Sequence, residues 1–191
     1  MKDIRTLLLD SAGVKTGLAA DAVFIAEVEK AAALMINCFR NGNKVLFCGN
    51  GGSAADAQHL AAELSGRFEK DRPPLPAEAL HVNSSFVTAV ANDYSFDNIY
   101  ARMVEAMGKE GDLLVGFSTS GNSQNVINAF ETAAKKKMLT IAFTGRDGGK
   151  IKSLAGICLN IPHNNTARIQ EAHITVGHII CKIVEETIFV E

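Results

Sequence analysis

Hydroxyl and amide side chains crowd the segment Ser118-Thr119-Ser120-Gly121-Asn122-Ser123, which stands directly before a stretch with helical periodicity. One such side chain is enough to cap a helix. The other hydroxyls, together with the free N–H groups of a helix N-terminus, are the donors that a phosphate monoester needs. The segment has no lysine and no GxxxxGK[ST] pattern, which argues against a nucleoside triphosphate. We predict a phosphate-binding loop; the alternative is a loop that only caps its helix.

A second candidate loop, Gly49-Asn50-Gly51-Gly52-Ser53-Ala54, also leads into a helical segment. Glycines let backbone N–H groups approach an anion closely, and the helix N-terminus favours negative charge. The loop fits the G-x-G-x-x-A variant of the dinucleotide fingerprint. That fingerprint also needs an acidic residue at the end of the second strand, where this chain has His81-Val82-Asn83. A dinucleotide oxidoreductase is therefore disfavoured, and a tight strand-to-helix turn is the structural alternative.

Two helical segments carry side chains that could bind a metal or transfer a proton. His59 and Glu63 are four residues apart, which places them on one helix face. In the C-terminal segment His178 stands in an apolar run, where a histidine is more often a core residue. At ~100° per residue, Glu171 falls about 20° from His178 and Gln170 about 80° from it. Spacing alone therefore favours Glu171 as the neighbour of His178.

A further polar group, Asn92-Asp93-Tyr94, follows the apolar segment 86–90. Asn and Asp are common at helix ends and in turns, where their side chains bond to the nearby backbone. The group is equally consistent with a functional site and with an ordinary helix C-cap.

Five short apolar runs must position these loops. Each is five or six residues long and nearly continuously apolar, as expected for strands buried on both faces. Their alternation with helices predicts a right-handed parallel sheet covered on both sides. Ligands of such sheets bind at the carboxyl ends of the strands, where both candidate loops lie. The runs are 44–48, 78–82, 112–117, 139–144 and 157–161, and the helices between them include 53–66 and 122–137.

The predicted fold class is α/β: a doubly wound, five-stranded parallel sheet flanked by helices, with a helical N-terminal extension. We expect one domain over 1–191, in which 1–43 form the extension and 44–191 form the α/β core. A long helix over 166–189 ends the chain. This helix is apolar on most of its circumference, so it should pack against other subunits together with the N-terminal helices, giving a tetramer.

Composition excludes several classes of protein. The 19 Lys and Arg against 21 Asp and Glu leave no cationic excess for nucleic acid. No run of 18 apolar residues occurs, and Asp3 and Asp10 interrupt the apolar N-terminus, so neither a membrane span nor a signal peptide is expected. The four cysteines are too far apart for a metal pair or redox motif. We expect a cytoplasmic protein with no nucleic-acid or membrane partner.

Taken together, five segments carry a family resemblance: CGNGGSAADAQHLAAELSGRF, VANDYSFDNIYARMVEAMGKEGDLL, FSTSGNS, TGRDGG and ARIQEAHITVGHI. They closely resemble the phosphoheptose isomerases, which belong to the sugar isomerase (SIS) family, over roughly residues 42–186. The STSGNS loop alone indicates only the SIS family. The HLAAE and RIQE…H segments point to the enzymes that act on heptoses.

The resemblance implies an isomerase that converts D-sedoheptulose 7-phosphate to D-glycero-D-manno-heptose 7-phosphate, the first step towards the ADP-heptose of lipopolysaccharide core or capsule. It also implies a homotetramer with active sites at subunit contacts and one zinc ion per subunit. On matching positions, Ser118, Thr119, Ser120 and Ser123 would hold the phosphate, and Asn50, Gly51, Gly52, Asn92 and Asp93 would line the sugar. The implied zinc ligands are His59, Glu63, Gln170 and His178; Glu63 and Gln170 would also contact substrate, and Glu63 and His178 would be the acid–base pair.

The chemistry of the residues agrees with this implication. Ketose–aldose isomerisation moves a proton between neighbouring carbons through an enediol, which requires a base such as a carboxylate and an acid such as an imidazole. The resemblance selects Gln170 where spacing favours Glu171. Some members have an Asp before the Arg of RIQE, whereas this chain has Ala167 there. If that Asp assists proton transfer in those members, its role in this chain is vacant or is filled by another group.

One alternative from another class is a non-catalytic SIS protein that binds phosphosugars, of the type that associates with the DnaA initiator. Retention of both Glu63 and His178 argues against this alternative, and absence of isomerase turnover would support it.

Overall fold

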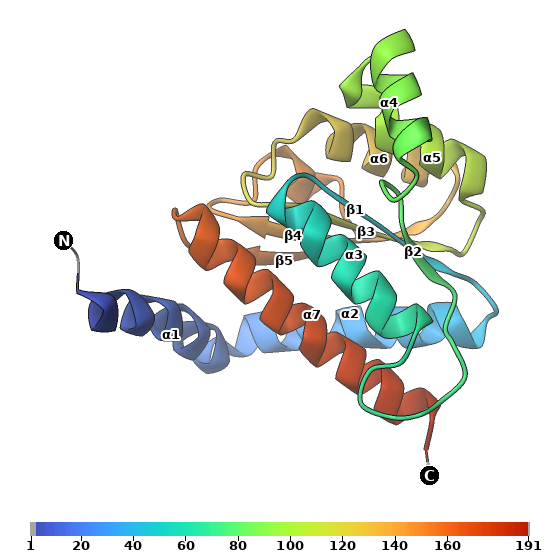
Figure 1. Ribbon diagram of the computed structural model, residues 1–191. Helices are drawn as coiled ribbons and strands as arrows, with labels where there is room; N and C mark the ends of the chain where they lie inside the picture. The colour runs from blue at the N-terminus through green and yellow to red at the C-terminus, as the bar shows by residue number, and fades with distance from the viewer. Residues whose placement is uncertain (1–2, 191) are drawn as a thin grey trace.

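The computed structural model describes residues 3–190, and its centre is a five-stranded parallel sheet with the strand order β2-β1-β3-β4-β5 (Figure 1). Residues 1, 2 and 191 of the predicted domain lie outside the described range. The strands are β1 (Val45–Gly49), β2 (Ala77–Ala79), β3 (Leu113–Ser118), β4 (Leu139–Gly145) and β5 (Ile157–Ile161). The predicted fold class is confirmed.

The central strands are buried throughout, as their continuous apolar character predicts. All residues of β1 and β3 are buried, and so are six of the seven residues of β4. Gly49 of β1 pairs with Phe117 of β3, and Ser118 of β3 pairs with Thr144 of β4. The carboxyl ends of these strands are therefore level, and the loops that follow them meet at one edge of the sheet.

Helices cover both faces of the sheet. The core on one face joins it to α2 (Ala22–Arg40), α3 (Gly52–Ser65) and α7 (Thr166–Ile188), while the core on the other joins it to α5 (Ile99–Met107) and α6 (Gln124–Lys135). Two short 3-10 helices, η1 (Phe96–Asn98) and η2 (Lys150–Ser153), complete the second face. α3 and α7 run side by side across the first face (Figure 1). This pairing brings together the two helices that carry the candidate metal and acid–base residues.

The second strand differs from the prediction. The expected strand 78–82 is only three residues long and starts one residue earlier, because it forms the edge of the sheet and pairs with β1 alone. Pro73, Pro74 and Pro76 precede it and have no N–H to donate. Leu80 still donates from its backbone N–H to the carbonyl of Phe47, at 2.8 Å, but the chain then turns into α4 (Ser84–Asp93).

The N-terminal region is helical, as predicted, and divides into α1 (Ile4–Ala20) and α2 at Asp21. The carboxylate of Asp21 accepts bonds from the N–H groups of Val23 and Phe24, so it caps α2 and ends α1. Figure 1 shows α1 extending beyond the body of the molecule beside the start of α7. No helix in residues 3–190 is long and apolar enough to cross a membrane.

Candidate active site

The loop after β1 is fastened to the loop after β3. The side-chain amides of Asn50 and Asn125 exchange two hydrogen bonds of 2.8 Å, and Asn125 is buried in the first turn of α6. Gly51 has φ +56°, a left-handed conformation that favours glycine. Sequence reasoning missed Asn125, although its position beside the hydroxyl-rich loop was a signal. The pair fixes the spacing of the two candidate loops.

The hydroxyl-rich loop leaves donors free at the start of α6. Ser123 is the N-cap residue but makes no side-chain cap bond; its Oγ lies 2.9 Å from the Oγ of Ser118. The Oγ of Ser120 accepts the N–H of Asn122 at 3.1 Å. Thr119 and Ser120 are half-buried. The side chain of Ser123 therefore does not cap α6, although Oδ1 of Asn125 accepts the N–H of Val126 at 2.9 Å. A helix start lined with hydroxyl groups suits the binding of an anion.

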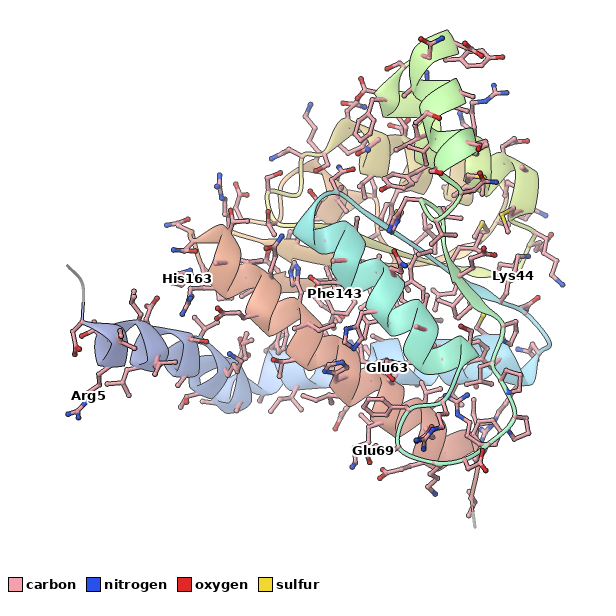
Figure 2. The ribbon with its side chains drawn as sticks, viewed as in Figure 1. Arg5, Lys44, Glu63, Glu69, Phe143 and His163 are labelled. Carbon is pink, nitrogen blue, oxygen red and sulfur yellow. The ribbon has the colours of Figure 1, made fainter. Side chains whose placement is uncertain are left out.

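Three side chains from α3 and α7 converge on one point. The Nε2 atom of His59 lies 2.9 Å from Oε1 of Glu63 and 3.1 Å from Nε2 of His178. Figure 2 shows Glu63 between these two helices. The side chain of His59 is 50% exposed and that of Glu63 is 23% exposed, and His178 is half-buried. The cluster therefore lies at the surface of the chain, open to a ligand.

The convergence fits a divalent metal. The ligand atoms of His59, Glu63 and His178 all lie within 4.8 Å of one another. Atoms about 2.0–2.2 Å from a tetrahedral zinc ion lie about 3.3–3.6 Å apart, so only small movements are needed. Two imidazole Nε2 atoms in such close approach repel one another unless a proton or a cation lies between them. Imidazole and carboxylate are also ligands that zinc accepts.

Gln170 and Glu171 lie on different sides of α7. A Cβ on Gly52 would come within 2.5 Å of Nε2 of Gln170, so this amide lies directly against the first residue of α3. Glu171 instead accepts a bond of 2.6 Å from Ser11 of α1 and pairs with Arg168 at 2.9 Å. The expectation from spacing that Glu171 accompanies His178 is therefore wrong, because α1 engages that carboxylate. Gln170 is eight residues from His178, about 12 Å along the helix axis.

The core histidine of α7 is His173. It is fully buried, its ring packs edge-on against Phe117 and Phe143, and its Nε2 donates to the carbonyl of Thr144 at 2.9 Å. Burial lowers the pKa of His173 to about 4, although the bond to Thr144 opposes this shift. His173 is therefore neutral at physiological pH. The structural role that the sequence offered as an alternative for His178 belongs to this residue.

Asp56 is a further candidate residue that sequence reasoning missed. It is one turn before His59 and two turns before Glu63, so its spacing puts it on the same face of α3. Its Oδ2 atom is buried without a hydrogen-bond partner among residues 3–190. Burial raises the pKa of Asp56 to about 6, against the opposing effect of His59. A carboxyl group that titrates near neutral pH next to a metal-type cluster is typical of functional sites.

Asn92 and Asp93 occupy the last turn of α4, as the helix-end interpretation predicts. Both side chains are exposed, and the amide of Asn92 donates to the carboxylate of Asp93 at 2.9 Å. Figure 1 shows α4 projecting away from the sheet and from the α3–α7 pair. Within this chain the two residues therefore stand apart from the His59–Glu63–His178 cluster.

Known proteins can be aligned with this chain over most of its length. The SIS domain family matches residues 22–145. The phosphoheptose isomerase of Sulfurimonas denitrificans is 46% identical over 188 residues, which cover 98% of this chain and 96% of that protein. The phosphoheptose isomerase of Citrifermentans bemidjiense is 54% identical over 164 residues, or 86% of this chain and 85% of that protein.

Solved structures agree with the sequence comparison. Phosphoheptose isomerase GmhA from Neisseria gonorrhoeae superposes with a TM-score of 0.90 at 44% identity, covering 96% of this chain and 97% of its own. A phosphoheptose isomerase from Francisella tularensis gives a TM-score of 0.89 at 41% identity, with 96% of each chain covered. The chain belongs to the SIS domain family, and within it to the phosphoheptose isomerases.

Proposed function

We propose that this protein is an enzyme that isomerises D-sedoheptulose 7-phosphate to D-glycero-D-manno-heptose 7-phosphate, a step towards ADP-heptose. The observation that carries the proposal is the convergence of the Glu63 carboxylate and the His178 imidazole on His59, in a chain of the phosphoheptose isomerase family. This arrangement supplies a base, an acid and a metal-binding position at one point.

The phosphate of the substrate is assigned to the loop 118–123. Ser118, Thr119, Ser120 and Ser123 supply hydroxyl donors, and the start of α6 supplies backbone N–H groups and a favourable dipole. Asn50, Gly51 and Gly52 are assigned to the sugar, and the bond between Asn50 and Asn125, which holds their loop beside the phosphate loop, supports this assignment. His59 lies about 10 Å along α3 from Gly52, which suits a substrate whose reacting carbons are remote from its phosphate.

Glu63 and His178 divide the proton transfers. Glu63 removes a proton from C1 of the ketose while His178 donates a proton to the oxygen on C2, which gives the enediol. Glu63 then returns its proton to C2, and His178 recovers a proton from the oxygen on C1 as the aldehyde forms. The net change is the transfer of hydrogen between two carbons, so no redox partner is needed.

The proposed metal is one zinc ion per subunit, held by His59, Glu63 and His178, with Gln170 as a further ligand. When bound, the ion polarises the carbonyl and hydroxyl oxygens and stabilises negative charge on the enediolate. The convergent ligand atoms support the first three assignments. Gln170 lies beside Gly52, so its approach to the ion would need movement of the side chain or a site shared between subunits.

We propose a homotetramer with active sites at subunit contacts. Three helices, α1, α2 and α7, form a groove with an almost wholly apolar lining. Ile25 and Ile179 stand in this groove and are 42% and 46% exposed in the single chain. The exposed Asn92–Asp93 pair on α4 could line the sugar of a neighbouring subunit. Burial of both surfaces would remove apolar area from water and would complete the site.

The proposed compartment is the cytoplasm. All four cysteines are free, and Cys38, Cys48 and Cys181 are buried. Burial raises the pKa of each of these three thiols to about 12, so they are unreactive apolar side chains. Free buried thiols without disulfides are usual where the environment is reducing.

Incubation of the pure protein with D-sedoheptulose 7-phosphate, with the aldose product followed over time, tests the proposal. Glu63→Gln keeps the shape of the side chain but removes the base, so turnover should fall by about 10²–10⁴. Binding of the phosphosugar should persist, because the loop 118–123 is unchanged. Incorporation of solvent deuterium at the reacting carbon should disappear together with turnover.

Folding and subunit mass of the Glu63→Gln variant must match the parent protein for this comparison. A folded Glu63→Gln variant that isomerises at the parent rate would place the base elsewhere. A parent protein that binds the phosphosugar without converting it would support the non-catalytic SIS alternative.

A further inference from the structure

A buried ion pair lies behind the cluster of His59, Glu63 and His178. Arg72, in the segment between α3 and β2, bonds through Nε to the carboxylate of Glu185 on α7 at 2.9 Å. Both side chains are only 2% exposed. Glu185 is seven residues beyond His178, two turns along the same face of α7. The pair therefore belongs to the same α3–α7 junction as the cluster but faces the protein interior.

Arg72 fixes the end of α3. Its guanidinium donates to the backbone carbonyl of Glu63 at 2.7 Å and to that of Leu64 at 2.8 Å. These carbonyls belong to the last turn of the helix, whose oxygens have no partners within the helix itself. The backbone of Glu63 is thereby tied through Arg72 to α7, the helix that carries His178.

Glu185 fixes the segment that follows α3. Its carboxylate accepts the successive backbone N–H groups of Phe68, Glu69 and Lys70, at 3.4, 2.9 and 2.9 Å. Burial alone would raise the pKa of Glu185, but the bonds from Lys70, Arg72 and Glu69 outweigh it and lower the pKa below its usual value. The bonds from Arg72 and the three backbone N–H groups therefore favour the charged form of this carboxylate.

The segment held by Glu185 reaches the cluster through Phe68. The ring of Phe68 stacks on the imidazole of His178, with ring centroids 5.8 Å apart and an interplanar angle of 23°. A ring stacked on an imidazole restricts its rotation, and here the Nε2 atom of His178 points to His59. The ion pair is thus linked to both partners of the proposed acid–base pair. Arg72 bonds to the backbone of Glu63, and Glu185 holds the segment whose Phe68 ring stacks on His178.

We propose that Arg72 and Glu185 are positioning residues for the acid–base pair and the metal ligands. This inference rests on the roles proposed for Glu63 and His178. Replacement of residues that bond to metal ligands and orient them typically lowers metal affinity or activity by about 10–100-fold. An arginine is required, because only its planar fork can bond to a carboxylate and two carbonyls at once.

The test compares Arg72→Lys with the parent protein. Lysine keeps the positive charge beside Glu185 but cannot bond to both carbonyls of α3 at the same time. We expect kcat to fall about tenfold or more, while KM for D-sedoheptulose 7-phosphate changes less than about threefold because the phosphate loop is untouched. The affinity for Zn²⁺, measured by competition with a chromophoric chelator, should fall about 10–100-fold.

Lys182→Gln is the matched control. It removes an exposed ion pair of 2.7 Å between the same helix and the same segment, from Lys182 to Glu69. Zinc affinity and kcat should stay within about twofold of the parent, because exposed pairs contribute little. Equal losses in the Lys182→Gln and Arg72→Lys variants would overturn the proposal, since any loosening of the segment would then suffice.

Phe68→Leu keeps the proposal testable if Arg72→Lys does not fold. This variant leaves the buried ion pair intact and removes only the ring stacked on His178, so zinc affinity should again fall. A folded Arg72→Lys variant, or failing that Phe68→Leu, with parent kcat and parent zinc affinity would overturn the proposal. Glu63→Gln is measured alongside, because its activity tests the acid–base assignment independently of Arg72. A failure of the proposed function can then be distinguished from a failure of the positioning role.

Discussion

The two histidines of α7 show how environment separates residues of the same type. His178 lies at the surface with its Nε2 directed at His59, whereas His173 is fully buried against Phe117 and Phe143. Only the former is open to a metal or a substrate. Burial keeps the buried ring neutral, and its bond to the carbonyl of Thr144 makes Nε2 the nitrogen that donates.

His173 should make the stability of the fold depend on pH. Its pKa falls from 6.5 to about 4 on folding, so the unfolded chain binds a proton that the folded chain refuses. The stabilisation is fully present above pH 6.5 and is lost as the pH falls towards about 4, with a total of about 3 kcal/mol. Urea unfolding of the parent and of His173→Leu between these pH values measures the effect.

The difference between the two proteins isolates His173 from other titrating groups. Asp56 acts in the opposite direction, because its raised pKa favours the folded state at low pH, but it is present in both. The gap in unfolding free energy between parent and His173→Leu should narrow as the pH is lowered. A gap that is constant with pH would contradict the prediction.

At the scale of elements, the site depends on the loop before α6 and on the close approach of α3 to α7. The loop presents hydroxyls that its own helix does not use. The two helices pack tightly where a Cβ on Gly177 would come within 2.4 Å of Leu60, and each of these residues is adjacent to a histidine of the cluster. Helix packing thus sets the distance between His59 and His178.

The loop can be tested with Ser120→Ala. The hydroxyl of Ser120 is expected to make a charge-assisted bond to the phosphate, worth about 1.5–3 kcal/mol. Its loss should weaken phosphosugar binding roughly ten- to a hundredfold in calorimetry. Thr132→Ala, which removes a hydroxyl further along α6 that bonds only to its own helix, is the control. Equal affinity of the Ser120→Ala variant and the parent would count against a phosphate site in this loop.

The helix contact can be tested with Gly177→Ala. The added methyl group would lie 2.4 Å from the buried side chain of Leu60, so that side chain or the spacing of α3 and α7 must change, and overpacking should cost about 1–3 kcal/mol of unfolding free energy. Zinc affinity should fall as well, because Leu60 and Gly177 are adjacent to His59 and His178 and a shift there changes the distance between the two imidazoles. Gly13→Ala is the control: nothing lies within 4 Å of its new methyl group, and alanine in α1 should stabilise the helix by about 1 kcal/mol.

At the scale of the whole molecule, the single chain exposes apolar surface along α1, α2 and α7. α7 contacts the core of its own chain through one side and contributes Ile179 to the apolar groove with α1 and α2 on another. Four large apolar residues of α1, Ile4, Leu7, Leu8 and Leu9, are exposed. An apolar surface of this kind is typical of an interface between subunits.

Light scattering at micromolar concentration should give a mass near four times the 20.4 kDa of one chain. Ile179→Asp would place a charge in the apolar groove and should dissociate the assembly, with loss of turnover if the site is shared between subunits. Leu154→Asp, at a residue that is 37% exposed beside η2, should leave the mass unchanged. A monomeric parent protein would refute the proposed assembly.

The sequence by itself determined the sheet, the two candidate loops and the pairing of His59 with Glu63. These features depend on local pattern: a buried parallel strand is apolar throughout, a loop lies next to its strand, and residues four apart share a helix face. The family resemblance, which selected Gln170 over Glu171, also comes from the residues alone.

The tertiary structure decided which groups meet. The angular position of a residue around its helix axis does not reveal which neighbouring element covers that side of the helix. It placed Glu171 against α1, Gln170 against Gly52 and His173 in the core. It also brought together Arg72 and Glu185, which are 113 residues apart and have no common motif. Contacts of this kind depend on how α3 and α7 cross, and the spacing of residues within either segment does not predict that crossing.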